Sequence, residues 1–206
     1  MVNVVKHPLI DHKMALIRDK HTPTKVFRDN VSEISGLLTF EITKNLETKK
    51  VVIETPLASI EVNVLNRPIV IVPILRAGLG MVDGISNIIP TAKIGHIGMY
   101  RDEFSLTPVT YYAKLPKEIK DGVSLVVDPM LATGGSASAC ISLLKQKGAY
   151  KIIFVGLVGC EVGIKKLLTE HPDVEIFLAS IDDYLNEKGY IVPGLGDCGD
   201  RLFGTK

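Results

Sequence analysis

The sequence predicts an α/β fold in which a mainly parallel sheet is flanked by helices on both faces. From residue 69 onward, short apolar runs alternate with stretches of helical periodicity, and each run has the length of one buried strand. The strand-like runs are residues 69–75, 94–99, 124–127, 152–158 and 176–181. The stretches between them are long enough for right-handed crossovers. Because ligands of such sheets bind beyond the carboxyl ends of the strands, we expect the site residues to follow these runs.

Two further elements precede this alternation. Thr22 and Pro23 predict an N-cap and a first-turn proline, after which apolar residues recur at helical spacing through about Leu46. Within residues 51–65, β-branched residues flank a turn that contains proline. This second pattern predicts a short antiparallel hairpin beside the main sheet.

Composition and charge favour one soluble domain spanning residues 1–206. Of the 206 residues, 46% are hydrophobic, which is enough to bury a sizeable core. Lys and Arg total 24 against 23 Asp and Glu, so the net field is too weak to attract nucleic acid or an anionic membrane. The three cysteines lie far apart in the sequence and form no CxxC pair, which favours free thiols in a reducing compartment. The N-terminus has no apolar core of signal-peptide length, and we expect a cytoplasmic protein.

The strongest single signal is residues 124–136, where a strand ends at Asp128 and a TGGS turn at 133–136 opens a helix that ends near Gly148. Backbone N–H groups and the helix dipole favour an anion there, and glycines let a phosphate approach closely. An ordinary tight turn with a serine cap is the alternative. Asp128 favours a sugar phosphate, because a carboxylate accepts hydrogen bonds from sugar hydroxyls. A nucleoside-triphosphate loop would also need a lysine after its glycines.

The segment DPMLATGGSA resembles the phosphoribosyl pyrophosphate loop of type I phosphoribosyltransferases, and in its residues that of the uracil-specific members. Four other segments carry the resemblance: PILRAGLGMVDGI (73–85), GMYRDE (98–103), PVTYYAKLP (108–116) and GYIVPGLGDCGDRLFGTK (189–206). It implies a pentosyltransferase of pyrimidine salvage that converts uracil and phosphoribosyl pyrophosphate to UMP and diphosphate.

The chain departs from the family pattern at two places. Pro129 replaces the second of two adjacent acidic residues that general members carry. Residues 158–164 read VGCEVGI, where the family reads close to AAPEGI. We expect the second departure to alter a loop near the nucleotide without touching the phosphate or base motifs.

By the same resemblance, Arg76 and Arg101 bind the diphosphate, and the Asp197 carboxylate faces the ribose, the diphosphate and the metal. A guanidinium fork suits two charged oxygens, although most arginines are solvated surface residues. We expect residues 102–114 to form a hairpin or flap that excludes water. The predicted ligands of phosphoribosyl pyrophosphate are Arg76, Arg101, Asp128, Pro129, Met130, Leu131, Ala132, Thr133, Gly134, Gly135, Ser136 and Asp197.

A glycine-punctuated backbone can read the two carbonyl groups and the N3–H of uracil. The resemblance assigns that contact to the main chain of Ile191, Gly196, Asp197 and Cys198, whereas a loop that only ties down the chain end is the alternative. The sequence contains no evident Ser-His-Asp or Cys-His constellation. None is needed, because loss of diphosphate leaves an oxocarbenium-like centre that the base nitrogen attacks directly. The predicted catalytic residues are Arg76, Arg101, Asp128 and Asp197.

Mg²⁺ is the implied cofactor, held mainly by substrate oxygens and water and by no protein ligand directly. Because some family members respond to GTP and change oligomeric state, a GTP effector and a homodimer or higher homo-oligomer are candidate partners. Two alternatives stay open. One is a phosphoribosyltransferase for another base, and the other is a nucleotide-sensing, RNA-binding regulator on the same fold, which would need a basic face.

Overall fold

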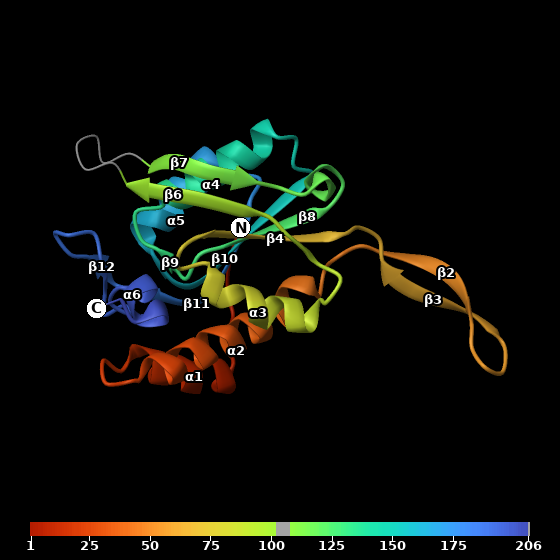
Figure 1. Cartoon of the computed structure of the whole chain (residues 1–206), viewed down its shortest axis with the longest axis horizontal. Helices are drawn as coiled ribbons and strands as arrows, with labels where there is room; N and C mark the ends of the chain where they lie inside the picture. The colour runs from red at the N-terminus through yellow and green to blue at the C-terminus, as the bar shows by residue number, and fades with distance from the viewer. Residues whose placement is uncertain (102–107, 206) are drawn as a thin grey trace.

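The computed structural model describes residues 1–101 and 108–205. The strands of the central sheet are β1 (Val2–Val4), β4 (Ile69–Leu75), β5 (Lys93–Ile94), β6 (His96–Arg101), β7 (Pro108–Lys114), β8 (Val123–Val127), β9 (Met130–Leu131), β10 (Lys151–Cys160) and β11 (Glu175–Asp182). They form a nine-stranded sheet in the order β1-β11-β10-β8-β4-β6-β7, with β5 paired to β4 and β9 to β10 (Figure 1). All pairs are parallel except β6 with β7. The predicted α/β fold is therefore confirmed.

Helices cover both faces of this sheet. The bounds of the helices are α1 (Pro8–Arg18), α2 (Thr24–Thr43), α3 (Leu79–Ile88), α4 (Gly135–Gln146), α5 (Glu161–Glu170) and α6 (Cys198–Phe203), with a 3₁₀ turn η1 at Lys117–Lys120. Residues of α1, α2 and α3 pack with Ile69 and Ile71 in one core, and residues of α4 and α5 pack with Val70 and Val72 in another. Successive side chains of a strand point to opposite faces, so β4 must be apolar at every position to serve both cores. Within the described ranges, no helix is long and apolar enough to cross a membrane.

The predicted long helix is present as α2, but its start differs from the prediction. The helix begins at Thr24 with Pro23 in the N-cap position, and no side chain caps it. The Thr22 hydroxyl instead donates a hydrogen bond to the Leu16 carbonyl oxygen. Thr22 was thus wrongly predicted as the N-cap, because its side chain joins the end of α1 to the connection between the two helices.

The predicted hairpin consists of β2 (Thr48–Glu54) and β3 (Ser59–Leu65), which form a two-stranded sheet of their own. The expectation that it lies beside the main sheet was wrong, because the hairpin projects away from the body of the protein (Figure 1). Residues on both of its faces are largely exposed. Alternation in the sequence predicts strands, but it does not say which surface covers them.

Several loops meet at the carboxyl edge of the sheet. There β4 ends at Leu75, β8 at Val127, β10 at Cys160 and β11 at Asp182. The C-terminal segment adds β12 (Tyr184–Leu185), β13 (Ile191–Val192) and α6 near the same edge. Since these strands are parallel, segments far apart in the sequence come together there.

Candidate active site

The predicted phosphate loop follows β8, and its first half is built into the sheet. The Pro129 carbonyl oxygen accepts hydrogen bonds from the N–H groups of Leu157 and Val158, both at 3.0 Å. The next two residues form β9, which pairs with β10. Pro129 and Leu131 are buried, so their side chains lie in the protein interior and only their backbone can face a ligand. This section is a rigid support for the glycine turn.

The glycine turn opens α4 as predicted. Gly134 has φ +77° and occupies the N-cap position, and α4 begins at Gly135. No side chain within the described residues caps α4, so the positive end of its dipole faces the turn. A Cβ atom on Gly135 would lie 3.7 Å from Thr133 Oγ1 and 4.0 Å from Pro108 Cδ, which is ordinary van der Waals contact, so the turn has room for it.

The first turn of α5 packs directly against this loop. A Cβ atom on Gly163 would lie 2.5 Å from the Ala132 carbonyl oxygen, and one on Gly134 would lie 2.8 Å from the Gly163 carbonyl oxygen. The expectation that residues 158–164 do not touch the phosphate motif was therefore wrong. The reason is the sheet order: β10 lies next to β8 and β9, so α5, which begins directly after β10, rests on the loop after β8.

Asp128 is the first residue after β8 and lines a pocket of about 240 Å³ at the carboxyl edge. Burial raises the pKa of its carboxyl group to about 7, although a hydrogen bond from the backbone of Met130 favours the ionised form. Such a carboxyl group is close to half protonated at neutral pH in the free protein. It therefore gains or loses a proton easily when a polar ligand enters.

The same pocket joins the end of β8 to the C-terminal loop. Its lining residues are Ala77, Asp128, Met130, Ala132, Gly189, Tyr190, Ile191, Gly196, Asp197, Cys198 and Gly199. All four residues predicted to contact uracil are among them. The pocket thus places the predicted sugar site and the predicted base site side by side, although about 60 residues of chain separate them.

Part of the C-terminal loop is exposed beside this pocket. Gly196 has φ +70° and is exposed, and Asp197 is the N-cap of α6, accepting a hydrogen bond from the Asp200 N–H at 2.9 Å. Cys198 is buried, and burial together with the nearby Asp128 raises the pKa of its thiol. Cys198 thus lines the pocket, and the raised pKa of its thiol disfavours the reactive thiolate.

Arg76 follows β4 at the carboxyl edge, as predicted, but does not line the pocket. Its Nη2 atom lies 3.2 Å from Asp200 Oδ1, and its side chain is 56% exposed. A Cβ atom on Gly199 would lie 3.7 Å from the same Nη2, which places the guanidinium beside the pocket rim. The sequence prediction missed Asp200, whose acidic side chain recurs one helical turn after the predicted Asp197.

The predicted hairpin after β6 is borne out in its two strands. Arg101 ends β6 opposite Pro108, the first residue of β7, and Pro108 lies next to the glycine turn. Residues 102–107, which are part of the predicted flap, lie outside the described residues. The Arg101 side chain, which was predicted to bind diphosphate, also lies outside the described part of the structure.

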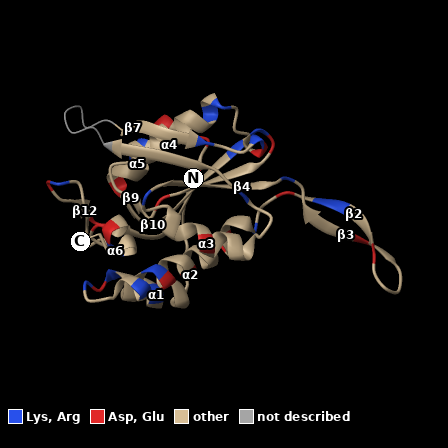
Figure 2. Cartoon of the chain, viewed as in Figure 1, with Lys and Arg blue, Asp and Glu red and all other residues tan. Residues whose placement is uncertain are grey.

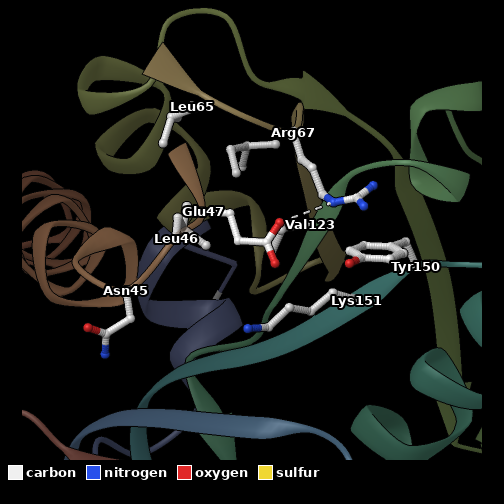
Figure 3. A pocket seen from close by; sticks show the side chains of 9 residues that line it. Asn45, Leu46, Glu47, Leu65, Arg67, Val123, Tyr150 and Lys151 are labelled. Carbon is white, nitrogen blue, oxygen red and sulfur yellow. Dashed lines mark ion pairs between the residues drawn. The ribbon is translucent and has the colours of Figure 1, made fainter. Parts of the chain in front are cut away.

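A second pocket lies at the opposite, amino edge of the sheet, where β4, β8 and β10 begin (Figure 3). It measures about 120 Å³, and its polar side chains already interact with one another. Arg67 stacks over Tyr150 at 3.7 Å and lies 3.7 Å from a Glu47 carboxylate oxygen. The carboxyl edge is the better candidate, because there the polar groups face an open pocket beside a helix N-terminus.

Comparisons with known proteins find relatives over nearly the whole chain. The family model described as uracil phosphoribosyltransferase matches residues 4–205. A relative named uracil phosphoribosyltransferase, from Acholeplasma laidlawii, is 66% identical over 203 residues, covering 98% of each chain. A solved structure of a protein from Aquifex aeolicus superposes with a TM-score of 0.95 at 36% identity, covering 100% of this chain and 99% of the other. An adenine phosphoribosyltransferase from Trypanosoma brucei shares the fold, with a TM-score of 0.59 at 14% identity over 87% of this chain and 82% of its own.

The glycine turn gives a matched pair of substitutions. Gly135→Ala should keep the stability of the protein, because its Cβ has room, but should weaken binding of phosphoribosyl pyrophosphate by filling the space that a phosphate needs. Gly134→Ala should unfold more easily, since both its positive φ and the backbone of Gly163 oppose a Cβ atom. Thermal unfolding and calorimetric titration measure the two effects. A Gly135→Ala variant that binds normally would contradict the phosphate site.

The raised pKa of Asp128 predicts a pH-dependent stability. Between pH 3.8 and about 7 the folded protein keeps a proton that the unfolded chain has lost, so the free energy of unfolding falls as pH rises through this window. At ~1.4 kcal/mol per pH unit over about 3.2 units, the free energy of unfolding falls by at most about 4.5 kcal/mol. Asparagine does not ionise, so Asp128→Asn removes this pH dependence. The free energy of unfolding of the variant should exceed that of the wild type by an amount that grows between pH 5 and pH 8. Urea unfolding at several pH values checks this, and a stability difference that is constant with pH would disprove it.

Proposed function

The chain belongs to the uracil phosphoribosyltransferase family, and from this premise we propose which of its residues carry the reaction. The enzyme is a pentosyltransferase that converts uracil and phosphoribosyl pyrophosphate to UMP and diphosphate, a step of pyrimidine salvage. The observation that supports the residue assignment is the shared pocket, because Asp128 and the backbone around Gly196 line it together. One substrate group belongs to each side of this pocket.

The ribose phosphate belongs on the side of β8. Thr133, Ser136 and the backbone of the two glycines offer hydrogen-bond donors at the start of α4, where the helix dipole favours an anion. Asp128 is placed to accept hydrogen bonds from the ribose hydroxyls. An ionised carboxylate accepts these bonds best, so ligand binding is expected to draw the Asp128 pKa below its free value.

The diphosphate belongs between Arg76 and Arg101. An exposed ion pair such as Arg76 with Asp200 contributes little free energy, so a diphosphate can take over the guanidinium at small cost. Arg101 ends the strand beside the glycine turn. Two guanidinium groups at this edge would stabilise the negative charge that develops on the leaving diphosphate.

Uracil belongs against the C-terminal loop. Ile191, Gly196, Asp197 and Cys198 line the pocket, and backbone N–H and C=O groups can match the donor and acceptor pattern of the base. Tyr190 borders this space, with its hydroxyl 3.5 Å from Asp197 Oδ2.

The donor set of the pocket fits Mg²⁺ held by substrate and water. Within the described part of the chain, no group of three or more His, Cys, Asp or Glu side chains could hold a metal ion. Asp128 and Asp197 are the acidic side chains of the pocket lining, and this ion commonly keeps most of its waters beside one or two carboxylates. When bound, Mg²⁺ would neutralise charge on the diphosphate.

Catalysis then depends on positioning and charge. The glycine turn holds the phosphate end of the sugar, and the C-terminal loop presents the base nitrogen toward ribose C1. Holding the two reactants in this way removes the entropy cost of a bimolecular encounter, and that cost is a large share of the activation barrier. The arginines stabilise the departing anion, and the chain needs no nucleophilic side chain.

Four further expectations stay proposals that rest on the family or on single features. We propose that residues 1–206 act as one domain, as the extent of the family match supports. A homo-oligomer is supported by the exposed apolar residues of the β2–β3 hairpin, such as Val52 and Ile53. Buried free thiols agree with a cytoplasmic enzyme. A GTP effector rests on the family alone. The RNA-binding alternative is not favoured, since Figure 2 shows basic and acidic residues interspersed.

The assignment of Arg101 predicts a strong effect on UMP formation. Arg101→Ala should lose ~2–4 kcal/mol of transition-state stabilisation, which is roughly 30- to 1,000-fold in catalytic efficiency. Arg67→Ala is the matched control, because Arg67 lies at the amino edge and should leave catalysis unchanged. The measurement follows UMP from phosphoribosyl pyrophosphate, Mg²⁺ and uracil, with cytosine and hypoxanthine as competing acceptors. Folded wild type that makes no UMP would refute the function, and an Arg101→Ala variant equal to wild type would remove Arg101 from the site.

A further inference from the structure

We infer that Arg18, Asp182 and Arg201 are positioning residues for the backbone that binds uracil. The inference rests on the proposed base site and names what holds that site in shape. These three side chains do not line the pocket. They connect the loop before Gly196 to the end of α1, an element that the sequence analysis did not associate with the site.

The first part of this connection is an ion pair between a half-buried arginine and a buried aspartate. Arg18 is the last residue of α1 and Asp182 the last residue of β11. The guanidinium and the carboxylate meet in a fork, with Nη1 to Oδ2 at 2.7 Å and Nη2 to Oδ1 at 2.6 Å. The Ser180 hydroxyl lies 3.0 Å from both partners. Because the Asp182 side chain is only 3% exposed, water competes little for this geometry.

This ion pair holds both polar backbone atoms of Gly194. The Gly194 N–H donates to Asp182 Oδ2 at 2.8 Å, and its carbonyl oxygen accepts from Arg18 Nη1 at 3.0 Å. Burial opposes ionisation of Asp182, but hydrogen bonds from Arg18 and Gly194 keep the pKa of this carboxyl group below its ordinary value. The Asp182 carboxylate therefore stays charged at neutral pH, and Gly194 stays fixed between it and the Arg18 guanidinium.

Arg201 holds the next residue in the loop. Its Nη1 atom donates to the Leu195 carbonyl oxygen at 2.9 Å and to the Ile17 carbonyl oxygen at 2.6 Å. Its Nη2 atom donates to the Asp19 carbonyl oxygen at 2.6 Å, and its guanidinium stacks over the buried Phe27 ring at 4.2 Å. Arg201 thus caps the carboxyl end of α1 while it fixes Leu195.

The pattern of burial matches a holding role. Gly194 and Leu195 are buried and bound, whereas Gly196 and Asp197 are exposed toward the pocket. Gly194 and Gly196 have φ of +60° and +70°, a backbone region that glycine enters and leaves easily. Without the tethers, uracil would have to order this segment when it binds, which lowers affinity. The effect should fall on uracil and leave the phosphate loop, which β10 and α5 hold, unaffected.

Arg18→Lys provides the test, because lysine keeps the charge but cannot bind Asp182 and Gly194 with one planar fork. The KM for uracil should rise about ten- to a hundredfold, as expected for losing a charge-assisted hydrogen bond. The KM for phosphoribosyl pyrophosphate should stay within about twofold of wild type. Arg28→Lys is the matched control: Arg28 donates to the Leu202 carbonyl oxygen at 3.2 and 2.8 Å, from α2 to α6, without touching residues 194–196. Its uracil KM should not change.

Hydrogen exchange of the free wild-type protein tests the same inference without a substitution. The Gly194 amide should exchange slowly before any uracil is added, and faster in Arg18→Lys or Arg201→Lys, while the amides of α4 keep their wild-type rates. A rapidly exchanging Gly194 amide in the wild type, or an unchanged uracil KM in Arg18→Lys, would overturn the positioning role. Failure of the wild type to form UMP would instead overturn the proposed function, and the two failures are thus distinguishable.

Discussion

The parallel pairing of β8 with β4 and β10 is the constraint on which the rest of the structure depends. Parallel strands need crossover connections. Here the crossover helices cover both faces of the sheet, and the loops lie at the ends of the strands. Because all three strands end on the same side, the loops that follow them must share one edge. Arg76, Asp128 and the start of α5 become neighbours for this reason alone.

The two halves of the pocket are held in different ways. The phosphate half is fixed by packing: β9 joins the sheet, and the backbones of Gly134 and Gly163 approach so closely that neither tolerates a Cβ atom. The base half lies in a loop with little regular structure, and its backbone is held by charged side chains from α1, β11 and α6. Packing suits a loop next to a buried strand, whereas a loop at the chain end needs polar tethers.

Two aspartates at this edge show how local surroundings set their chemistry. Asp128 is desolvated, and a hydrogen bond from the Met130 backbone offsets this only in part, so its pKa rises to about 7. Asp182 is also buried, but a guanidinium and the Gly194 N–H favour its charge, so its pKa falls. The first carboxyl group is left ready to respond to a ligand, and the second is a permanent part of the framework. A nearly neutral chain thus carries sharply different local electrostatics.

Resemblance to a known family was needed to predict the C-terminal residues around Gly196. The sequence by itself determined the α/β class, the strands from residue 69 onward, and the glycine turn that follows Asp128. Apolar runs must be buried, and glycines at strand ends mark where the backbone needs freedom, so these features are local and readable. Only the tertiary structure decided that the β2–β3 hairpin leaves the body, that Gly163 supports the phosphate loop, and that Arg18 reaches Asp182. The two contacts join segments that lie more than 20 residues apart in the chain, and the hairpin is not covered by any other described segment of the body. The residue pattern of one segment contains no information about which distant segment packs against it.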